Sequence, residues 1–279
     1  MKILVLGASS YVGARIYFDL QKKYEVVGTY ANNRLSEKLH HLDITDRQKV
    51  SELISEVKPD LIVHSANNAN ARWCEANPEA AELLNVTSTG YIVEAADAIN
   101  AKLVYISSFA AMNVGNVYGR SKLQSENIAK KTKAGWIILR PSYIVGFSPN
   151  TTNDRPFNRL LRNLDDHVKA EYDTSWKFQV TWVGHLSEVI DGCIEKNMYK
   201  KLIPVAAQEL KSRFDVAHDI LTPFGVTVYP VDKKDNLPVT KDDLFKLKTL
   251  ELPVYSYKEI VDKIIAEIKV RNTFTISRI

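Results

Sequence analysis

The residues with the clearest chemical potential are Tyr118 and Lys122, which stand four positions apart in a segment with helical spacing. Side chains four apart share one face of a helix. A lysine ammonium beside a phenol favours the phenolate and lowers the pKa of the phenol. Such a tyrosine can exchange a proton with an oxygen atom during hydride transfer. Ser108 ends a predicted strand and is placed to hydrogen-bond the same oxygen, so Ser108, Tyr118 and Lys122 form the predicted catalytic group.

The same spacing occurs a second time, from Tyr229 to Lys233. That copy contains Pro230, which prevents a regular helix and leaves the two side chains without a common face. Tyr118 differs because it opens a helix and follows a strand that ends in serines. The alternative interpretation of Tyr118 is a surface tyrosine beside a solvated lysine.

A glycine turn near the start of the chain predicts a nucleotide site. Residues 2–6 are apolar and β-prone, residues 7–13 read GASSYVG, a helical pattern follows, and residues 25–30 read as a second strand. This order is the front half of a dinucleotide-binding βαβ unit. Gly7 permits the tight turn and Gly13 permits close packing of helix on strand. Small residues at 8–10 let N–H groups reach a pyrophosphate at the positive end of the helix. The alternative is a glycine turn in some other α/β protein.

The loop after the second strand bears on the choice of cofactor. A carboxylate there would bind the ribose hydroxyls of NAD, but residues 31–34 read Ala-Asn-Asn-Arg. Arg34 is placed where a guanidinium would meet a 2′-phosphate, which favours NADP(H) while leaving NAD(H) open. A solvated loop arginine is the alternative interpretation of Arg34.

Strands alternate with helices through residue 140, which predicts an α/β fold with a Rossmann-type, doubly wound parallel sheet. We expect an NAD(P)-binding domain at residues 1–149 and a smaller α/β substrate lobe at residues 150–279, with the chain crossing back to the Rossmann core. The further predicted strands are residues 61–66, 102–106, 136–140, 178–182 and 200–206, with a short one ending at 42–46. The further predicted helices run to residue 57 and over 78–100, 118–131, 157–164, 186–196, 208–221 and 257–269.

Composition excludes several functional classes. The net charge of +4 comes from lysines and arginines spread along the chain, which argues against a nucleic-acid surface. The two cysteines, Cys74 and Cys193, match no metal-ligand spacing, so no metal site is expected. No apolar run has the length of a membrane span, and the sequence starts directly in a strand rather than in a signal-peptide pattern. We therefore expect a cytoplasmic protein that binds neither membrane nor nucleic acid.

The chain resembles the extended short-chain dehydrogenase/reductases, and among them the dTDP-4-dehydrorhamnose reductase branch. The likeness is firm to about residue 146 and thin beyond about residue 195. The stretches that carry it are GASSYVG at 7–13, LDITD at 42–46, KPDLIVHSA at 58–66, KLVYISS at 102–108, YGRSKLQSE at 118–126, LRPSYIVG at 139–146 and TWVGHLSEVI at 181–190.

This resemblance implies roles for particular residues. Tyr118 would be the acid, Lys122 would anchor the cofactor ribose, and Ser108 would polarise the substrate carbonyl. The lobe would hold a nucleotide-sugar. The implied cofactor-binding residues are Gly7, Ser9, Ser10, Tyr11, Val12 and Gly13 at the turn, Arg34, Asp43 and Ile44 towards the adenosine, Ala66 along the cofactor, and Lys122 and Pro141 towards the nicotinamide.

The sequence also departs from the family pattern. Ser10 replaces the usual middle glycine, and Phe109 follows Ser108 where the family has an acidic residue. The interval from Ser108 to Tyr118 is short, and His185 stands where an aspartate is usual. The leading hypothesis is an NADP(H)-dependent reductase of a keto group on a nucleotide-activated sugar, and the resemblance also allows a homodimer. The alternatives are an NAD-dependent nucleotide-sugar epimerase or dehydratase, and a non-catalytic NADP-binding regulatory subunit.

Overall fold

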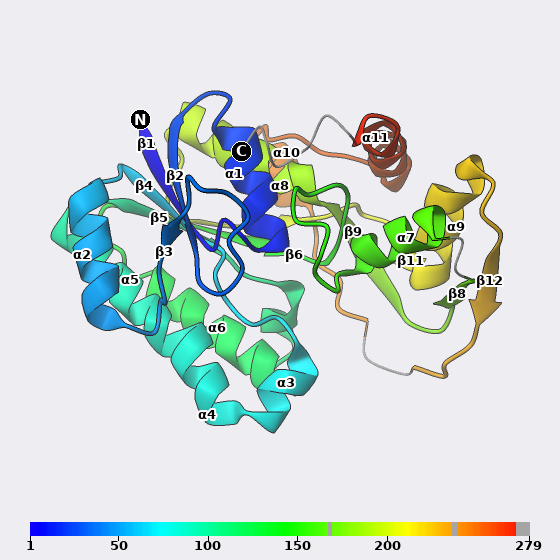
Figure 1. The fold of residues 1–279 in the computed structure, drawn as a ribbon, viewed down its shortest axis with the longest axis horizontal. Helices are drawn as coiled ribbons and strands as arrows, with labels where there is room; N and C mark the ends of the chain where they lie inside the picture. The colour runs from blue at the N-terminus through cyan, green and yellow to red at the C-terminus, as the bar shows by residue number, and fades with distance from the viewer. Residues whose placement is uncertain (167–168, 236–238, 272–279) are drawn as a thin grey trace.

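A parallel sheet forms the centre of the computed structural model, which describes residues 1–166, 169–235 and 239–271 (Figure 1). The order of its strands reverses between β1 and β4, so their carboxyl ends border the crevice where doubly wound folds bind ligands. The predicted fold class is confirmed. Across the sheet the strands are β10 (Lys201–Val205), β6 (Trp136–Pro141), β5 (Lys102–Ile106), β4 (Leu61–His64), β1 (Lys2–Leu6), β2 (Glu25–Tyr30) and β3 (His40–His41).

Successive side chains along each strand point to opposite faces of the sheet. Both faces are apolar, and helices cover both. Ile3 and Val5 pack in one hydrophobic cluster, whereas Leu4 and Leu6 pack in another on the opposite face. The first face is covered by α1 (Tyr11–Leu20), α8 (Val183–Glu195) and α10 (Phe245–Thr249). The second is covered by α2 (Arg47–Val57), α5 (Ser88–Ala98) and α6 (Val117–Ala129).

Three predicted elements differ from the structure. The helix predicted over 78–100 is α4 (Pro78–Ala81), a π-helical segment η1 (Glu82–Thr87) and α5, and it ends at Ala98. The short strand predicted to end at 42–46 is β3, and the residues after it turn into α2, capped by Asp46. The helix predicted from residue 208 begins later, as β11 (Leu210–Ser212) followed by α9 (Arg213–Leu221). The reason is a capping box, in which Ser212 and Asp215 bond each other's backbone N–H groups.

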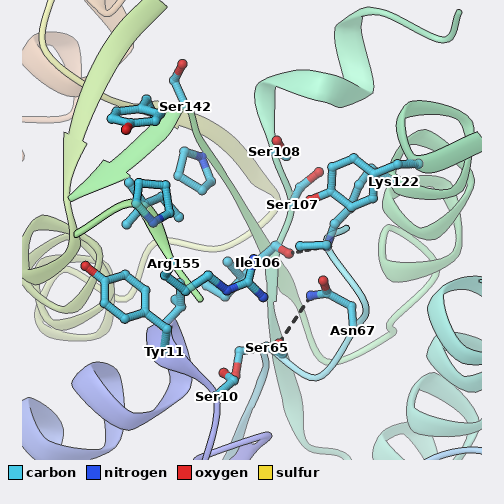
Figure 2. A pocket seen from close by; sticks show the side chains of 17 residues that line it. Ser10, Tyr11, Ser65, Asn67, Ile106, Ser107, Ser108, Lys122, Ser142 and Arg155 are labelled. Atoms are coloured by element: carbon cyan, nitrogen blue, oxygen red, sulfur yellow. Dashed lines mark hydrogen bonds between the residues drawn. The ribbon is translucent and has the colours of Figure 1, made fainter. Parts of the chain in front are cut away.

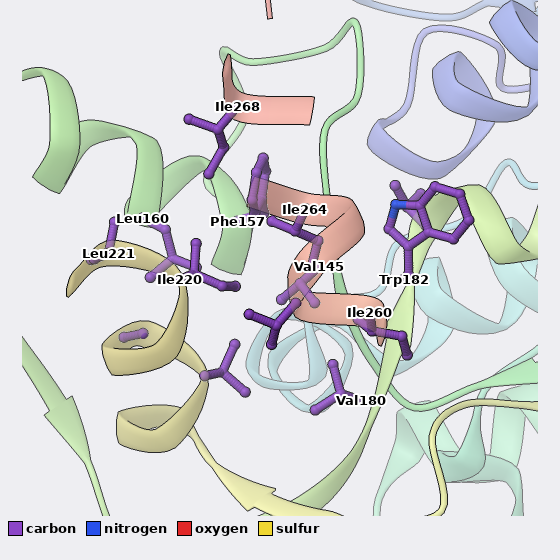
Figure 3. Packing of buried hydrophobic residues seen from close by; sticks show 14 of the residues in the cluster. Val145, Phe157, Leu160, Val180, Trp182, Ile220, Leu221, Ile260, Ile264 and Ile268 are labelled. Atoms are coloured by element: carbon purple, nitrogen blue, oxygen red, sulfur yellow. The ribbon is translucent and has the colours of Figure 1, made fainter. Parts of the chain in front are cut away.

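The lobe packs two small sheets against helices. Its sheets are β11–β9–β7, with β7 (Tyr143–Val145) and β9 (Lys177–Trp182), and β12–β8, with β8 (Ala170–Asp173) and β12 (Val228–Val231). Its core lies between α7 (Pro156–Asp165), α9 and α11 (Tyr257–Lys269). Figure 3 shows Ile260, Ile264 and Ile268 of α11 directed into this core, which confirms the predicted amphipathic helix.

The chain returns to the main sheet after entering the lobe. β10 pairs with β6, and Leu186 and Val189 of α8 share a core with β1. The Rossmann core therefore draws on residues beyond 149. Residues 272–279, the end of the predicted lobe, lie outside the described residues. Within the described ranges no helix is long and apolar enough to cross a bilayer, and no cluster of three or more His, Cys, Asp or Glu is arranged to hold a metal.

A buried ion pair joins α1 to α11. Arg15 of α1 is 4% exposed, and its Nη1 lies 2.7 Å from Oε1 of Glu267 in α11. Its Nε donates to Asp19 at 2.6 Å. Glu267 also accepts from the Phe147 N–H at 2.9 Å and from Trp182 Nε1 at 3.1 Å. Both charges are compensated by hydrogen bonds, as a buried pair requires.

Candidate active site

The glycine turn has the geometry that a dinucleotide needs. Gly7 has a φ of +80°, a conformation that favours glycine. A Cβ at Gly13 would lie 2.1 Å from the Gly7 carbonyl oxygen, so only glycine lets α1 approach the turn this closely. Ser10 caps α1 by accepting from the Gly13 N–H at 3.0 Å. Tyr11 and Val12 start the helix, and N–H groups of a first turn have no acceptor within their own helix. The turn therefore fits a pyrophosphate.

A cavity of about 220 Å³ opens at the carboxyl edge of the sheet, beside this turn (Figure 2). It brings together predicted residues from four separate parts of the chain. The predicted residues that line it are Ser10, Tyr11, Val12, Ser108, Tyr118, Lys122 and Pro141. The catalytic group and the start of α1 therefore face one space.

The other predicted cofactor residues lie outside this cavity. Gly7 and Gly13 form the turn, and Ala66 packs on Gly7, where an added Cβ would be 2.9 Å from the Ala66 backbone. The Ser9 carbonyl accepts from Asn150 Nδ2 at 2.7 Å. These contacts fix the shape of the turn.

The residues predicted to face the adenosine have local partners. Asp43 accepts from the Thr45 N–H at 2.9 Å and hydroxyl at 2.7 Å. Ile44 is buried in the core beneath α2. The Arg34 guanidinium pairs with the Glu37 carboxylate at 2.8 Å. That pair is largely exposed and therefore weak, so it leaves Arg34 available to a phosphate.

The sequence predicted that Lys122 lowers the pKa of Tyr118, but in the structure the Lys122 ammonium is bound elsewhere. Its Nζ donates to the Ile106 carbonyl at 2.9 Å and to the Tyr105 hydroxyl at 3.2 Å. The Tyr118 ring centroid lies 5.9 Å away. Burial lowers the pKa of Lys122 to about 7 and raises the pKa of Tyr118 to about 12. The prediction of an acidic phenol is wrong for this structure, because desolvation outweighs the favourable charges. The groups that counter the raised pKa of Tyr118 are Ser108, by a hydrogen bond, and Arg155, by its charge.

A buried network supports the cavity floor. Ser107 donates to Oε1 of Glu126 at 2.6 Å. The Arg140 guanidinium donates to both oxygens of Glu126, at 2.7 Å each, and Glu126 is fully buried. The network ties α6 to β5 and β6, so it fixes the helix that carries Tyr118 and Lys122. Sequence reasoning missed it, although Glu126 follows Lys122 by four residues on the same helix face.

Residues after β4, after β6 and before α7 line the cavity as well. Asn67 follows β4, and Ser142 and Tyr143 follow β6. Arg155 comes from the loop before α7, where the sequence predicted no site residue. Its one available signal was its place directly before the Pro-Phe pair that opens a helix.

The Lys122→Met variant is expected to gain stability relative to the wild type as pH falls from about 10 to about 7. Burial lowers the pKa of Lys122 to about 7. Between that value and the unfolded value of about 10.4, the unfolded wild type binds more protons than the folded one. Wild-type stability should therefore rise with pH in this window, whereas the methionine contributes no such dependence. Thermal midpoints across the window test this, and a difference that is constant with pH would contradict it.

This fold, with a glycine turn at its first strand–helix junction and Tyr118 and Lys122 on one helix at the cavity, is that of the extended short-chain dehydrogenase/reductases. The model of the RmlD substrate binding domain family matches residues 1–243, and the chain belongs to that family.

Comparisons with individual proteins agree with this membership. The chain is 30% identical over 159 residues to methionine adenosyltransferase 2 subunit beta of Rattus norvegicus, covering 52% of this chain and 47% of that protein. It is 29% identical over 160 residues to dTDP-4-dehydrorhamnose reductase of Escherichia coli, covering 52% of each. The chain thus spans about half the length of these curated relatives. In structure it is similar to dTDP-4-dehydrorhamnose reductase of Bacillus anthracis in complex with NADP, with a TM-score of 0.80 at 20% identity, covering 95% of this chain and 98% of that one.

Proposed function

We propose that this protein is an NADP(H)-dependent reductase of a keto group on a nucleotide-activated sugar. The observation that carries the proposal is the convergence of Ser108, Tyr118 and Lys122 on one cavity that the first turn of α1 also lines. The E. coli and B. anthracis relatives, both dTDP-4-dehydrorhamnose reductases, support the class of substrate.

In the proposed reaction, Tyr118 is the proton donor. A bound nicotinamide would supply the hydride. As the carbonyl carbon gains it, the C=O π bond breaks and the oxygen takes the phenolic proton of Tyr118. Ser108, which lines the same cavity as Tyr118, stabilises the developing oxyanion. A phenol with a pKa near 12 stays protonated at neutral pH, which suits an acid in the reductive direction. Lys122 has spare N–H donor capacity for a ribose hydroxyl.

NADP(H) is the proposed cofactor, with NAD(H) as the second choice. No carboxylate follows β2 within residues 31–34, and Arg34 offers a cation at that position. The bound NADP in the B. anthracis structure supports this choice, and the NAD+ in Bordetella bronchiseptica WbmH supports the second. A homodimer stays a prediction.

A non-catalytic regulatory subunit is the second candidate function. The rat relative, named as a subunit of another enzyme, favours it. Phe109 in place of the family's acidic residue favours it too. Against it stand all three groups of the proposed proton transfer, which line the same cavity.

One assay separates these functions. Purified protein is mixed with NADPH, and in parallel with NADH, and a panel of nucleotide 4-keto sugars, while the absorbance of the reduced cofactor is followed. Oxidation that depends on both the sugar and the protein supports the reductase. Cofactor binding without turnover on the panel would favour the regulatory subunit. NAD that copurifies and stays bound through turnover would favour an epimerase or dehydratase.

A further inference from the structure

Arg155 brings a cation from the lobe into the cavity. It is the residue before α7, where Pro156 takes the first helical position and Phe157 is fully buried in the lobe core. These two neighbours fix the place from which the Arg155 side chain leaves the helix end. Figure 2 shows the guanidinium extending into the cavity, between Tyr11 and Asn67 in this view. Its charge acts on both Tyr11 and Tyr118.

The cavity offers Arg155 no counter-charge. Its lining includes two cations, Lys122 and Arg155, and no carboxylate. The adjacent Asp154 is bound instead by Arg159 at 2.6 Å and Arg162 at 2.9 Å. In the described part of the chain, the Arg155 guanidinium has no ion-pair or hydrogen-bond partner. A partly desolvated guanidinium without a partner is best compensated by an anionic ligand.

The loop before Arg155 is fastened to the glycine turn. Asn150 Nδ2 donates to the Ser9 carbonyl at 2.7 Å, and the Ser148 hydroxyl donates to the Tyr11 carbonyl at 2.6 Å. Both donors are buried. The loop therefore holds Arg155 opposite the first turn of α1, with the cavity between them.

We infer that Arg155 binds an oxyanion of the cofactor diphosphate, from the side opposite α1. The inference rests on the proposed function, since it assigns a dinucleotide to this cavity. A guanidinium can donate two parallel hydrogen bonds to one phosphate. Arg155 would thus complete the site from the lobe, while the glycine turn and α1 supply the Rossmann side. The same diphosphate chemistry exists in a nucleotide-sugar, so the test separates the two sources.

The test compares Arg155→Gln with Arg159→Gln. Both variants lose one arginine charge in the same part of the chain, but Arg159 lies outside the cavity and pairs with Asp154. Calorimetry measures the Kd of NADPH alone, and then the Kd of dTDP with NADPH saturating. Arg155→Gln is expected to weaken NADPH binding at least about tenfold, the loss of one charged hydrogen-bond pair, and Arg159→Gln to change it less than about twofold. Arg155→Lys should recover only part of the affinity.

The outcomes are distinct. NADPH affinity unchanged in Arg155→Gln, with dTDP weakened, would overturn the cofactor assignment and place the substrate diphosphate at Arg155. Both affinities unchanged would overturn an anion-binding role altogether. A wild type that binds neither NADPH nor NADH would overturn the proposed function itself, a result independent of the variants. Thermal midpoints of the variants close to that of the wild type confirm that binding, and not folding, is compared.

Discussion

Replacing Tyr118 with phenylalanine is expected to lower the rate of NADPH oxidation with a keto-sugar substrate by about a hundredfold or more. The substitution removes only the hydroxyl, so the ring keeps its packing in the cavity while the proton donor disappears. Lys122 cannot replace it, because its Nζ is directed to the Ile106 carbonyl and the Tyr105 hydroxyl. Initial rates at saturating NADPH and sugar measure the effect, with the Kd of NADPH measured beside them.

The matched control is Tyr91→Phe, which removes the same hydroxyl from α5, away from the cavity. Its rate should equal that of the wild type. Tyr118→Phe should bind NADPH with nearly wild-type affinity, which separates lost chemistry from lost binding. A Tyr118→Phe enzyme with an unchanged rate would rule out the proposed proton donor.

Replacing Glu126 with glutamine is expected to lower the free energy of unfolding by about 3–5 kcal/mol. Glu126 is fully buried, and it binds Arg140 through two hydrogen bonds of 2.7 Å and Ser107 through a third. Glutamine removes the negative charge and leaves the Arg140 guanidinium uncompensated at a site that is mostly shielded from water. Urea unfolding, followed by tryptophan fluorescence, measures the change.

Glu94→Gln provides the comparison for this variant. Glu94 pairs with Arg47 at 2.9 Å, but both side chains are more than half exposed. An exposed pair of this kind contributes at most about 1 kcal/mol. If Glu126→Gln were no less stable than Glu94→Gln, the buried network would not be holding α6 in place.

The Rossmann half could be predicted from the sequence because its signals are local and strong. Residues 2–6 and 102–106 are short apolar runs whose length and β-branched residues favour buried strands, and a segment with helical spacing comes later in the chain after each. The lobe was harder to predict, because β7 and β11 are three residues long. Such short strands do not show the alternation of apolar and polar residues that marks a strand in a sequence. The start of α9 depends on a capping box that a helical pattern alone does not reveal.

The site was predicted in its residues but not in its electrostatics. The spacing of Tyr118 and Lys122 does place both at one cavity. Spacing does not tell how deeply each is buried, and burial decides the direction in which their pKa values move. Arg155 was not found because its place before the start of a helix does not tell where its side chain lies. Only the packing of the following helix places it at the cavity.

The contact between Arg15 and Glu267 limits how early the glycine turn can complete its folding during synthesis of the chain. The two residues are separated by most of the chain, yet each is the other's buried counter-ion. On the ribosome, a nascent chain that lacks Glu267 leaves Arg15 with Asp19 but without its partner in α11, and removing one partner from a buried ion network is strongly unfavourable. Since Arg15 belongs to the helix that begins at the glycine turn, we expect this turn to gain its final packing only after α11 has left the exit tunnel.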